Sequence, residues 1–506
     1  MNNPPESGNT VSHNEVMKMP DHGSYENVPI AESLEKALAD LREITGGSMD
    51  INTPRLTING TECAVVTAEG MVSGETVGEL LLLPLMSLNG GTHSTPQSIM
   101  RFCTEESMMS SNKTVCYTYG SALGLLFSGF ALVFVDGVPF AAAFGIQGYA
   151  VRAVSQPVSE NELLASQEGF AEVVRTNISL IRRRIKHPSL TFEMIQCGKL
   201  SSTDVCIAYV RGKADENAVA GIRRRLSEIR LDSVLTPGYI QPFLERDEGR
   251  RLFSEVGVTE RPDLLCTELI RGRIGVIVDG APFALIVPYL FAENFGTVDD
   301  YSVKRYYAFF VKIMRWLAFL LAAAFPGVYL AAVNHDTEML PLKLLLNLAA
   351  GEKTTLLSLF TELVVIVLLL EILREASIRL PHAIGTAMSI AGGLIIGDTA
   401  VKSGIISSPL LIIVGVTATA SFVLPSFSQQ LPVLRLMFIF AGGFAGFFGI
   451  SACAVMLSAN ICSQSLDGVP FSSPAAPFHP DGLSEMLGRK TFRRMEKDEP
   501  TTKDLT

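Results

Sequence analysis

The chain has 506 residues, 48% of them hydrophobic and 18% charged, and this length allows more than one folded unit. A formal net charge of −10 argues against a nucleic-acid partner, which favours a basic surface. The eight cysteines include no CxxC pair, so the sequence favours reduced structural thiols over a disulfide framework or a zinc site.

Residues 1–50 read as a disordered or partly helical N-terminal tail. Residues 1–30 are polar and lack both the basic start and the apolar core of a secretory signal, so the following domain is expected to stay in the cytoplasm. A short amphipathic helix is predicted at 31–44, with Leu34, Leu38 and Leu41 on one side.

Two similar segments, ALVFVDGVPFAAAF (131–144) and IGVIVDGAPFALIV (274–287), recur in the first 300 residues. Asp-Gly between apolar runs is typical of a β-hairpin, because glycine adopts the positive φ that such turns require. We therefore predict one hairpin in each of two α/β subdomains, 51–150 and 151–303, consistent with an old duplication. A catalytic role for Asp136 or Asp279 is the alternative, but turn chemistry explains both aspartates.

Helical and strand patterns alternate between the two hairpins. Apolar residues at helical spacing predict helices within 163–186 and 215–231, and the run 204–210 predicts a strand. Each helix carries three consecutive arginines, Arg182 to Arg184 and Arg223 to Arg225. These arginines could bind lipid headgroups or phosphate, or they could form a solvated face paired with acids. For the second triplet we favour the paired face, and for the first both remain open.

Motifs that would indicate catalysis are missing from the sequence. It contains no GxSxG, Walker A, HExxH or Rossmann fingerprint, and its seven histidines are scattered. We expect neither an enzyme nor a bound cofactor or metal.

Long apolar runs dominate the chain after residue 308. A bilayer core about 30 Å thick needs about 20 apolar residues per helical span. The fold class is therefore an α/β cytoplasmic domain of two subdomains plus an α-helical polytopic membrane domain at 304–462. We predict spans at about 311–333, 355–373, 404–425 and 434–461, and a cytoplasmic tail at 463–506.

The positions of basic residues orient these spans. Lysines and arginines precede the first span, follow the second and recur in the tail, which places all three regions in the cytoplasm and requires an even number of crossings. The run 383–397 is about 15 residues long and rich in glycine, so we predict a re-entrant or surface segment there.

Ionisable residues at membrane depth are candidates for a pore or a gate, because a charge in hydrocarbon usually faces a cavity or a partner. Glu362 is the deepest, and a ring of such acids, one from each subunit, would select cations. The other candidates lie at the end of the second span and after the short segment: Glu371, Arg374, Glu375, Arg379 and Asp398. Gly442 and Gly446 form a GxxxG pattern that predicts close helix packing, by default between subunits.

Several motifs resemble those of the A subunit of GerA-type spore germinant receptors. The clearest are EILREASIRLPHAIGTAMSIAGGLIIGDTAV (371–401), SGIISSPLLIIVGVTATASFVLP (403–425), EGFAEVVRTNISLIRRRIKHPSLTFE (168–193) and LIRGRIGVIVDGAPFALIVPYLFAENFGTVDDYSVKRYY (269–307). The last is DGVPFSSPAAPF (467–478), and the resemblance covers roughly 115–480 in one order.

The resemblance implies a role that composition does not show. Members of this family look like subunits of ring-shaped, nutrient-gated channels that release monovalent cations across the spore inner membrane. Their partners are a transporter-like B subunit that binds the nutrient and a lipoprotein C subunit. Three alternatives remain: a signal-amplifying channel similar to the stage V sporulation AF group, a non-conducting membrane scaffold, and a secondary transporter, which four spans disfavour.

Overall fold

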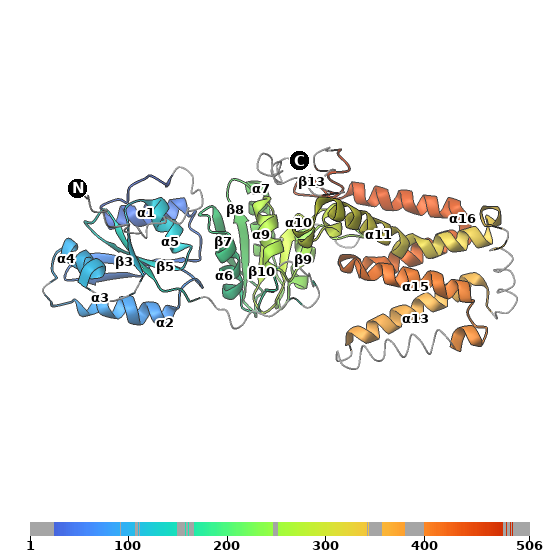
Figure 1. Cartoon of the computed structure of the whole chain (residues 1–506), viewed down its shortest axis with the longest axis horizontal. Coiled ribbons are helices and arrows are strands. Elements are labelled where there is room, and N and C mark those ends of the chain that lie inside the picture. The colour runs from blue at the N-terminus through green and yellow to red at the C-terminus, as the bar shows by residue number, and fades with distance from the viewer. Residues whose placement is uncertain are drawn as a thin grey trace, which may run out of the picture. The chain divides into compact units, whose positions relative to one another are not determined.

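The computed structural model describes most of the chain. The described residues are 25–91, 93–106, 110, 112–148, 157, 160, 166–245, 251–341, 343, 357–379, 399–478, 482, 486 and 488. The chain divides into two compact units (Figure 1). One holds the two large β-sheets, and the other, called the helical unit below, holds the long helices. The segment 383–397 and Asp398 lie outside the described residues.

The first lobe (residues 25–148) contains a six-stranded sheet in the order β1-β3-β5-β6-β4, with β2 also paired to β3. These neighbouring strands pair in antiparallel fashion. Its strands are β1 (Ile51–Asn52), β2 (Arg55–Ile58), β3 (Thr61–Ala68), β4 (Lys113–Cys116), β5 (Phe130–Val135) and β6 (Ala141–Gly145). Neighbouring residues of a strand point to opposite faces of the sheet, and both faces are buried here, so β5 is apolar throughout and β3 is apolar from Cys63 to Val66.

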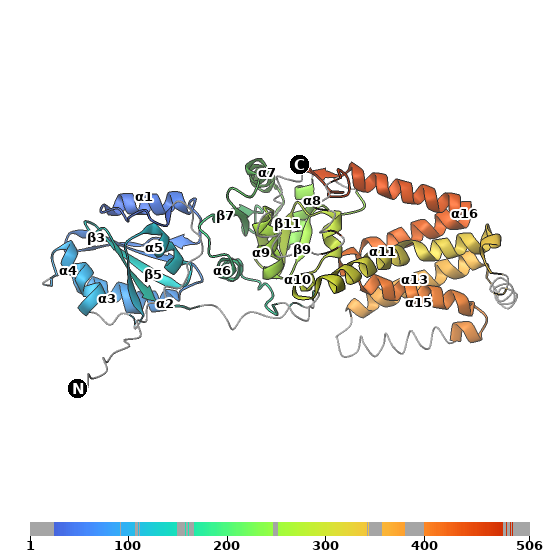
Figure 2. The same ribbon diagram turned by 45° about the horizontal axis from the view of Figure 1, so that its top comes forward.

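Helices cover both faces of this sheet (Figures 1 and 2). On one face lie α1 (Leu34–Ile44) and α5 (Tyr119–Leu126). On the other lie α2 (Gly74–Val77), η2 (Gly78–Leu82), α3 (Leu83–Ser87), α4 (Pro96–Arg101) and η3 (Phe102–Glu106). The predicted boundary at residue 51 leaves α1 outside this subdomain, but α1 supplies five buried residues to its core.

The second lobe (residues 166–286) has a five-stranded sheet in the order β7-β8-β10-β11-β9. Its strands are β7 (Leu190–Cys197), β8 (Thr203–Val210), β9 (Gly257–Thr259), β10 (Ile274–Val278) and β11 (Ala284–Val287). Its helices are α6 (Val174–Arg184), α7 (Glu216–Ser227) and α9 (Pro262–Ile270). Here α6 packs against α9 and α7 against β7. The predicted helices are confirmed with shorter bounds, and the predicted strand at 204–210 corresponds to β8.

The repeated Val-Asp-Gly segments form equivalent hairpins in the two lobes, and the aspartate of each hairpin caps the start of a helix. Asp136 Oδ1 accepts the backbone N–H of Leu34 at 2.9 Å, and Asp279 Oδ1 accepts that of Val174 at 2.9 Å. These amides belong to the first residues of α1 and α6, whose own preceding residues give no side-chain cap. Each aspartate therefore satisfies an unpaired helix-start amide from a distant turn, which confirms a structural role for both.

A buried ion pair joins the two lobes. Arg182 of the second lobe and Asp50 of the first are both 0% exposed. The arginine donates from Nε to Asp50 Oδ2 at 2.6 Å and from Nη2 to Asp50 Oδ1 at 3.1 Å. Its guanidinium carbon lies 4.5 Å from the ring centre of Phe127 and 5.1 Å from that of Phe192, one ring from each lobe. We call this group the lobe clamp.

The arginine triplets bind acids and carbonyls of the chain itself. Besides Asp50, Arg182 donates to the carbonyls of His187 and Leu190. Arg183 and Arg184 both pair with Glu168, whose pKa their positive charges lower despite partial burial. Arg223 pairs with Glu193 at 2.7 Å. These contacts favour the paired-acid interpretation over headgroup binding for the first triplet and for Arg223 of the second.

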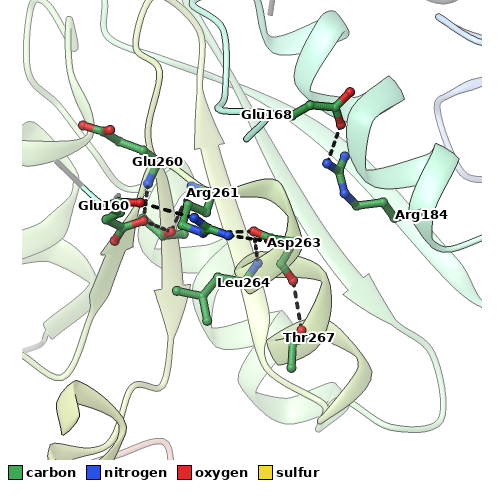
Figure 3. A network of polar contacts seen from close by, with 9 residues as sticks. Glu160, Glu168, Arg184, Glu260, Arg261, Asp263, Leu264 and Thr267 are labelled. Atoms are coloured by element: carbon green, nitrogen blue, oxygen red, sulfur yellow. Dashed lines mark hydrogen bonds and ion pairs between the residues drawn. The ribbon is translucent and has the colours of Figure 1, made fainter. Parts of the chain in front are cut away.

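Glu160 connects to the second lobe through a polar network (Figure 3). Its Oε2 accepts from Thr259 Oγ1 at 2.7 Å and from the Glu260 amide at 3.2 Å, and its carbonyl accepts from Arg261 Nη1 at 3.2 Å. Arg261, 2% exposed, is also paired with Asp263. Burial raises the pKa of Glu160 from 4.5 to about 7, outweighing those hydrogen bonds.

We expect the stability of this unit to fall as the pH rises from about 4.5 to about 7. In that window the folded carboxyl keeps a proton that the unfolded chain releases, so deprotonation of the folded form costs stability. At about 1.4 kcal/mol per pH unit, the loss is on the order of 3 kcal/mol. Thermal unfolding between pH 4.5 and 8 measures it. Glu160→Gln should remove this pH dependence of stability, whereas the exposed Glu228→Gln should not change it. If Glu160→Gln kept the pH dependence of the native protein, Glu160 would not be its source.

Candidate functional site

The site candidates lie in the helical unit, which is built from four described helices longer than ten residues. These are α11 (Arg305–Asn334), α13 (Leu359–Arg379), α15 (Ser408–Phe422) and α16 (Gln430–Ser463). Among the described residues, two helices, α11 and α16, are long and apolar enough to cross a membrane. The helix α13 has 21 residues but carries five ionisable side chains, and α15 has only 15 residues.

The last helix does not run straight. At Gly446 the backbone has φ 57° and ψ −144°, a non-helical conformation, and Gly449 returns next to the carbonyl of Ala441. The limbs 430–445 and 447–463 therefore fold back on each other (Figures 1 and 2). At 1.5 Å per residue they are about 24 and 26 Å long. The predicted single span at 434–461 therefore contains a break at Gly446, because glycine permits a backbone reversal that any other residue would resist.

The helices α13 and α15 run in the same direction. The Glu362 carboxylate, in the first turn of α13, accepts the amide of Ser407, which precedes α15. Near the other end, Arg374 Nη1 donates to the carbonyl of Ser428, which follows α15, at 2.8 Å.

Glu362 is inside the chain's own bundle. It is 1% exposed, and Leu359, Leu363 and Leu410 belong to the apolar cluster around it. Its Oε2 accepts the Ser407 amide at 3.1 Å, so a carboxylate meets the positive end of α15. Within the single chain, the Glu362 side chain therefore contacts the start of α15 and does not lie on an exposed surface.

The other acidic and basic candidates of α13 form local pairs. Glu371 is ion-paired with Arg374, and both are about one-third exposed. Glu375 is paired with Arg379 at 2.6 Å and both are exposed. The first pair also acts on Arg435 of α16, since the charges of Glu371 and Arg374 both reach that arginine. The end of α13 therefore faces a buried cation, and Asp398 lies outside the described residues.

Arg435 is not among the predicted site residues, although it is a lone arginine in the apolar run LPVLRLMFIF (431–440). It is 4% exposed, and its Nε donates to the carbonyl of Ala322 in α11 at 3.1 Å. That carbonyl is available because Pro326, four residues later, has no N–H to donate to it. Arg435 thus supplies the hydrogen bond that the proline removes.

The glycines of α16 bring it against α11 of the same chain. A Cβ on Gly442 would lie 2.4 Å from the carbonyl oxygen of Gly327, and one on Gly327 would lie 2.3 Å from that of Phe438. The backbones therefore touch, as small residues allow. Close packing at Gly442 is present, with a partner inside the chain, whereas Gly446 makes the reversal beside His335.

An aromatic cluster closes one end of this unit. It joins the short helix η5 (Phe291–Phe295), α11 and the turn η7 (Pro425–Phe427). Phe295 stacks on Trp316 with ring centres 3.7 Å apart, and Phe291 meets Phe427 at 5.6 Å. Beside it, Arg315 pairs with Asp300 at 2.7 Å. This cluster fixes the start of α11 against the start of α16.

Taken together, the described helices of this unit hold a small number of charged groups among apolar side chains. Within the described parts of the chain, no group of three or more His, Cys, Asp or Glu residues could hold a metal ion. Glu362, Arg435 and the Glu371–Arg374 pair have the chemistry to hold or pass charge, whereas none pairs a nucleophile with a base.

Comparison with known proteins decides the family. The family model described as "Bacillus/Clostridium GerA spore germination protein" matches residues 39–501. The chain belongs to the GerA family. Spore germination protein KA of Bacillus subtilis (strain 168) is 35% identical over 477 residues, covering 93% of this chain and 87% of that protein. Another relative of the same organism, named the uncharacterized membrane protein YfkQ, is 29% identical, covering 93% and 91%.

A solved structure also matches the chain. It is the N-terminal domain of the A subunit of the Bacillus megaterium spore germinant receptor GerK3, 31% identical over 52% of this chain and 97% of that one, with a TM-score of 0.43. Membership of the GerA family confirms the resemblance found in the motifs. The cited relatives are named as germination or membrane proteins.

Proposed function

We propose that this chain is the membrane-embedded A-type subunit of a spore germination receptor, and that several copies form a nutrient-gated path for monovalent cations. Its partners would be a transporter-like B subunit and a lipoprotein C subunit. It would lie in the spore inner membrane, with both lobes and the C-terminus in the cytoplasm.

One observation carries this proposal: the helical unit keeps Glu362 and Arg435 almost fully buried among apolar helices. Removing such charges from water is costly, so proteins that retain them at membrane depth usually use them in transport or gating. The start of α11 supports a membrane location. Tyr306, Tyr307 and Phe310 are more than half exposed beside the basic Lys304 and Arg305, as in the aromatic belt of a bilayer interface.

A second candidate, a non-conducting scaffold, is favoured by a different observation. Glu362 satisfies the start of α15 in its own chain, and Gly442 packs against α11 of that chain, so both have structural work without an oligomer. In that case the helices would anchor the lobes beside a nutrient-binding partner.

Cation flux separates the two. Liposomes loaded with potassium and containing this chain with its B and C partners should release the ion when nutrient is added. Glu371→Gln should slow the release several-fold, because it unbalances the charges around Arg374 and Arg435. The exposed Glu338→Gln, in the turn η6 (Thr337–Met339) after α11, is the matched control.

The possible outcomes point in different directions. Nutrient binding without any flux would support the scaffold and reject the channel. Flux from the chain without its nutrient-binding partners would instead favour the amplifying type of channel.

A further inference from the structure

Two residues joined by a hydrogen bond, Glu362 and Ser407, each have a buried side-chain oxygen without a hydrogen-bond partner among the described residues. Glu362 is 1% exposed and Ser407 8% exposed, and a hydrogen bond from the Ser407 amide to Glu362 Oε2 links them at 3.1 Å. Within the described residues, neither the other carboxylate oxygen, Oε1, nor the Ser407 hydroxyl has a hydrogen-bond partner. Buried polar atoms are nearly always paired, so this pair of free oxygens calls for a ligand.

The surroundings of these atoms do not neutralise the carboxylate. Apolar side chains, among them Leu363, Ile406 and Leu410, form the cluster in which it lies. The helix α15 contains no charged residue, and the amide of Ser407 meets only one of the two carboxylate oxygens. The described charged group closest in sequence to Ser407 is Lys402, which is exposed, and the closest to Glu362 is Glu371, which is paired with Arg374. A carboxylate in such a place gains most from a bound positive charge.

We propose that Glu362 and Ser407 form the anionic half of a binding site for one partly dehydrated alkali cation, sodium or potassium, inside each single chain. Oε1 and the hydroxyl are the two side-chain ligands, and carbonyls of the non-helical turn 403–406 complete the shell, as unwound backbone does in transporters. A single carboxylate matches one positive charge, whereas divalent ions usually draw several acidic ligands. The site rests on the proposed conduction role and adds to it a place where the ion is held.

Binding is tested on the full-length protein in detergent micelles, without any measurement of flux. Its Tm is followed while sodium chloride or potassium chloride replaces choline chloride at constant ionic strength. A cation that binds only the folded state raises Tm in a saturable way. We expect such a rise in the native protein, its loss in Glu362→Gln and a weaker apparent affinity in Ser407→Ala. Glu338→Gln should respond like the native protein.

Each result decides the proposal. Equal Tm values of the native protein in all three salts would overturn it, whatever the variants do, and would leave a water or a proton as the occupant of the space. A rise that survives in Glu362→Gln would also overturn it, by placing the cation elsewhere. Radioactive rubidium or sodium retained by the native protein would confirm stoichiometry. Saturable stabilisation without flux in liposomes would keep this site and reject the channel, and flux without stabilisation would do the reverse.

Discussion

Arg182→Met should lower the free energy of unfolding of the two-lobed unit by about 3–5 kcal/mol, because it leaves the Asp50 carboxylate buried without a counter-charge. The loss includes the contacts of the guanidinium with Phe127 and Phe192. Urea unfolding of the full chain in micelles, read by hydrogen exchange of the amides in β3 and β8, reports this unit separately from the helices.

The control for the lobe clamp is a double substitution. Asp50→Leu with Arg182→Met removes both charges, so it should cost clearly less than the sum of the two single changes. Exposed Arg223→Met, which breaks a pair that is about half exposed, should change stability by less than about 1 kcal/mol. If the double variant lost as much stability as the two single variants together, the charges of Arg182 and Asp50 would not stabilise each other, in contradiction to their short distance.

Local patterns were enough to predict the elements of the lobes. The spacing of Leu34, Leu38 and Leu41 predicted α1, and the repeated Asp-Gly dipeptides predicted both hairpins, because these signals act within a few residues. The sequence patterns did not predict which distant residue each polar side chain would contact. Asp136 caps a helix that starts 102 residues earlier, and Arg182 meets an acid 132 residues away. No period or motif encodes such distances.

The helical unit was harder to predict for a related reason. An apolar run indicates that a segment is buried in protein or lipid, but it does not indicate where the chain reverses direction. The run that contains AGGFAGFFG has four glycines within eight residues (442–449), and only Gly446, which lies beside His335, has the reversed backbone. The contact between Glu362 and Ser407 was likewise not predictable from the apolar runs, because it depends on the parallel direction of α13 and α15.

Arg435→Met should destabilise the helical unit by about 1–3 kcal/mol, the cost of leaving a buried carbonyl without a donor, here that of Ala322. Since Pro326 is the reason that this carbonyl is free, Pro326→Ala supplies an amide that can take the place of the arginine. Arg435→Met should therefore cost less in a Pro326→Ala background than in the native chain, by roughly 1 kcal/mol of coupling.

Thermal and urea unfolding in micelles measure the four members of that cycle, with exposed Arg379→Met as the matched loss of an α13 arginine, expected to cost under about 0.5 kcal/mol. If the two changes prove additive, the carbonyl at the proline does not depend on Arg435, and the arginine is retained for its charge beside Glu371 and Arg374. In that event Arg435→Lys should preserve stability. If the cycle shows the coupling, Pro326 of α11 and the buried arginine of α16 form one structural unit, and a movement of either helix has to break the hydrogen bond between them.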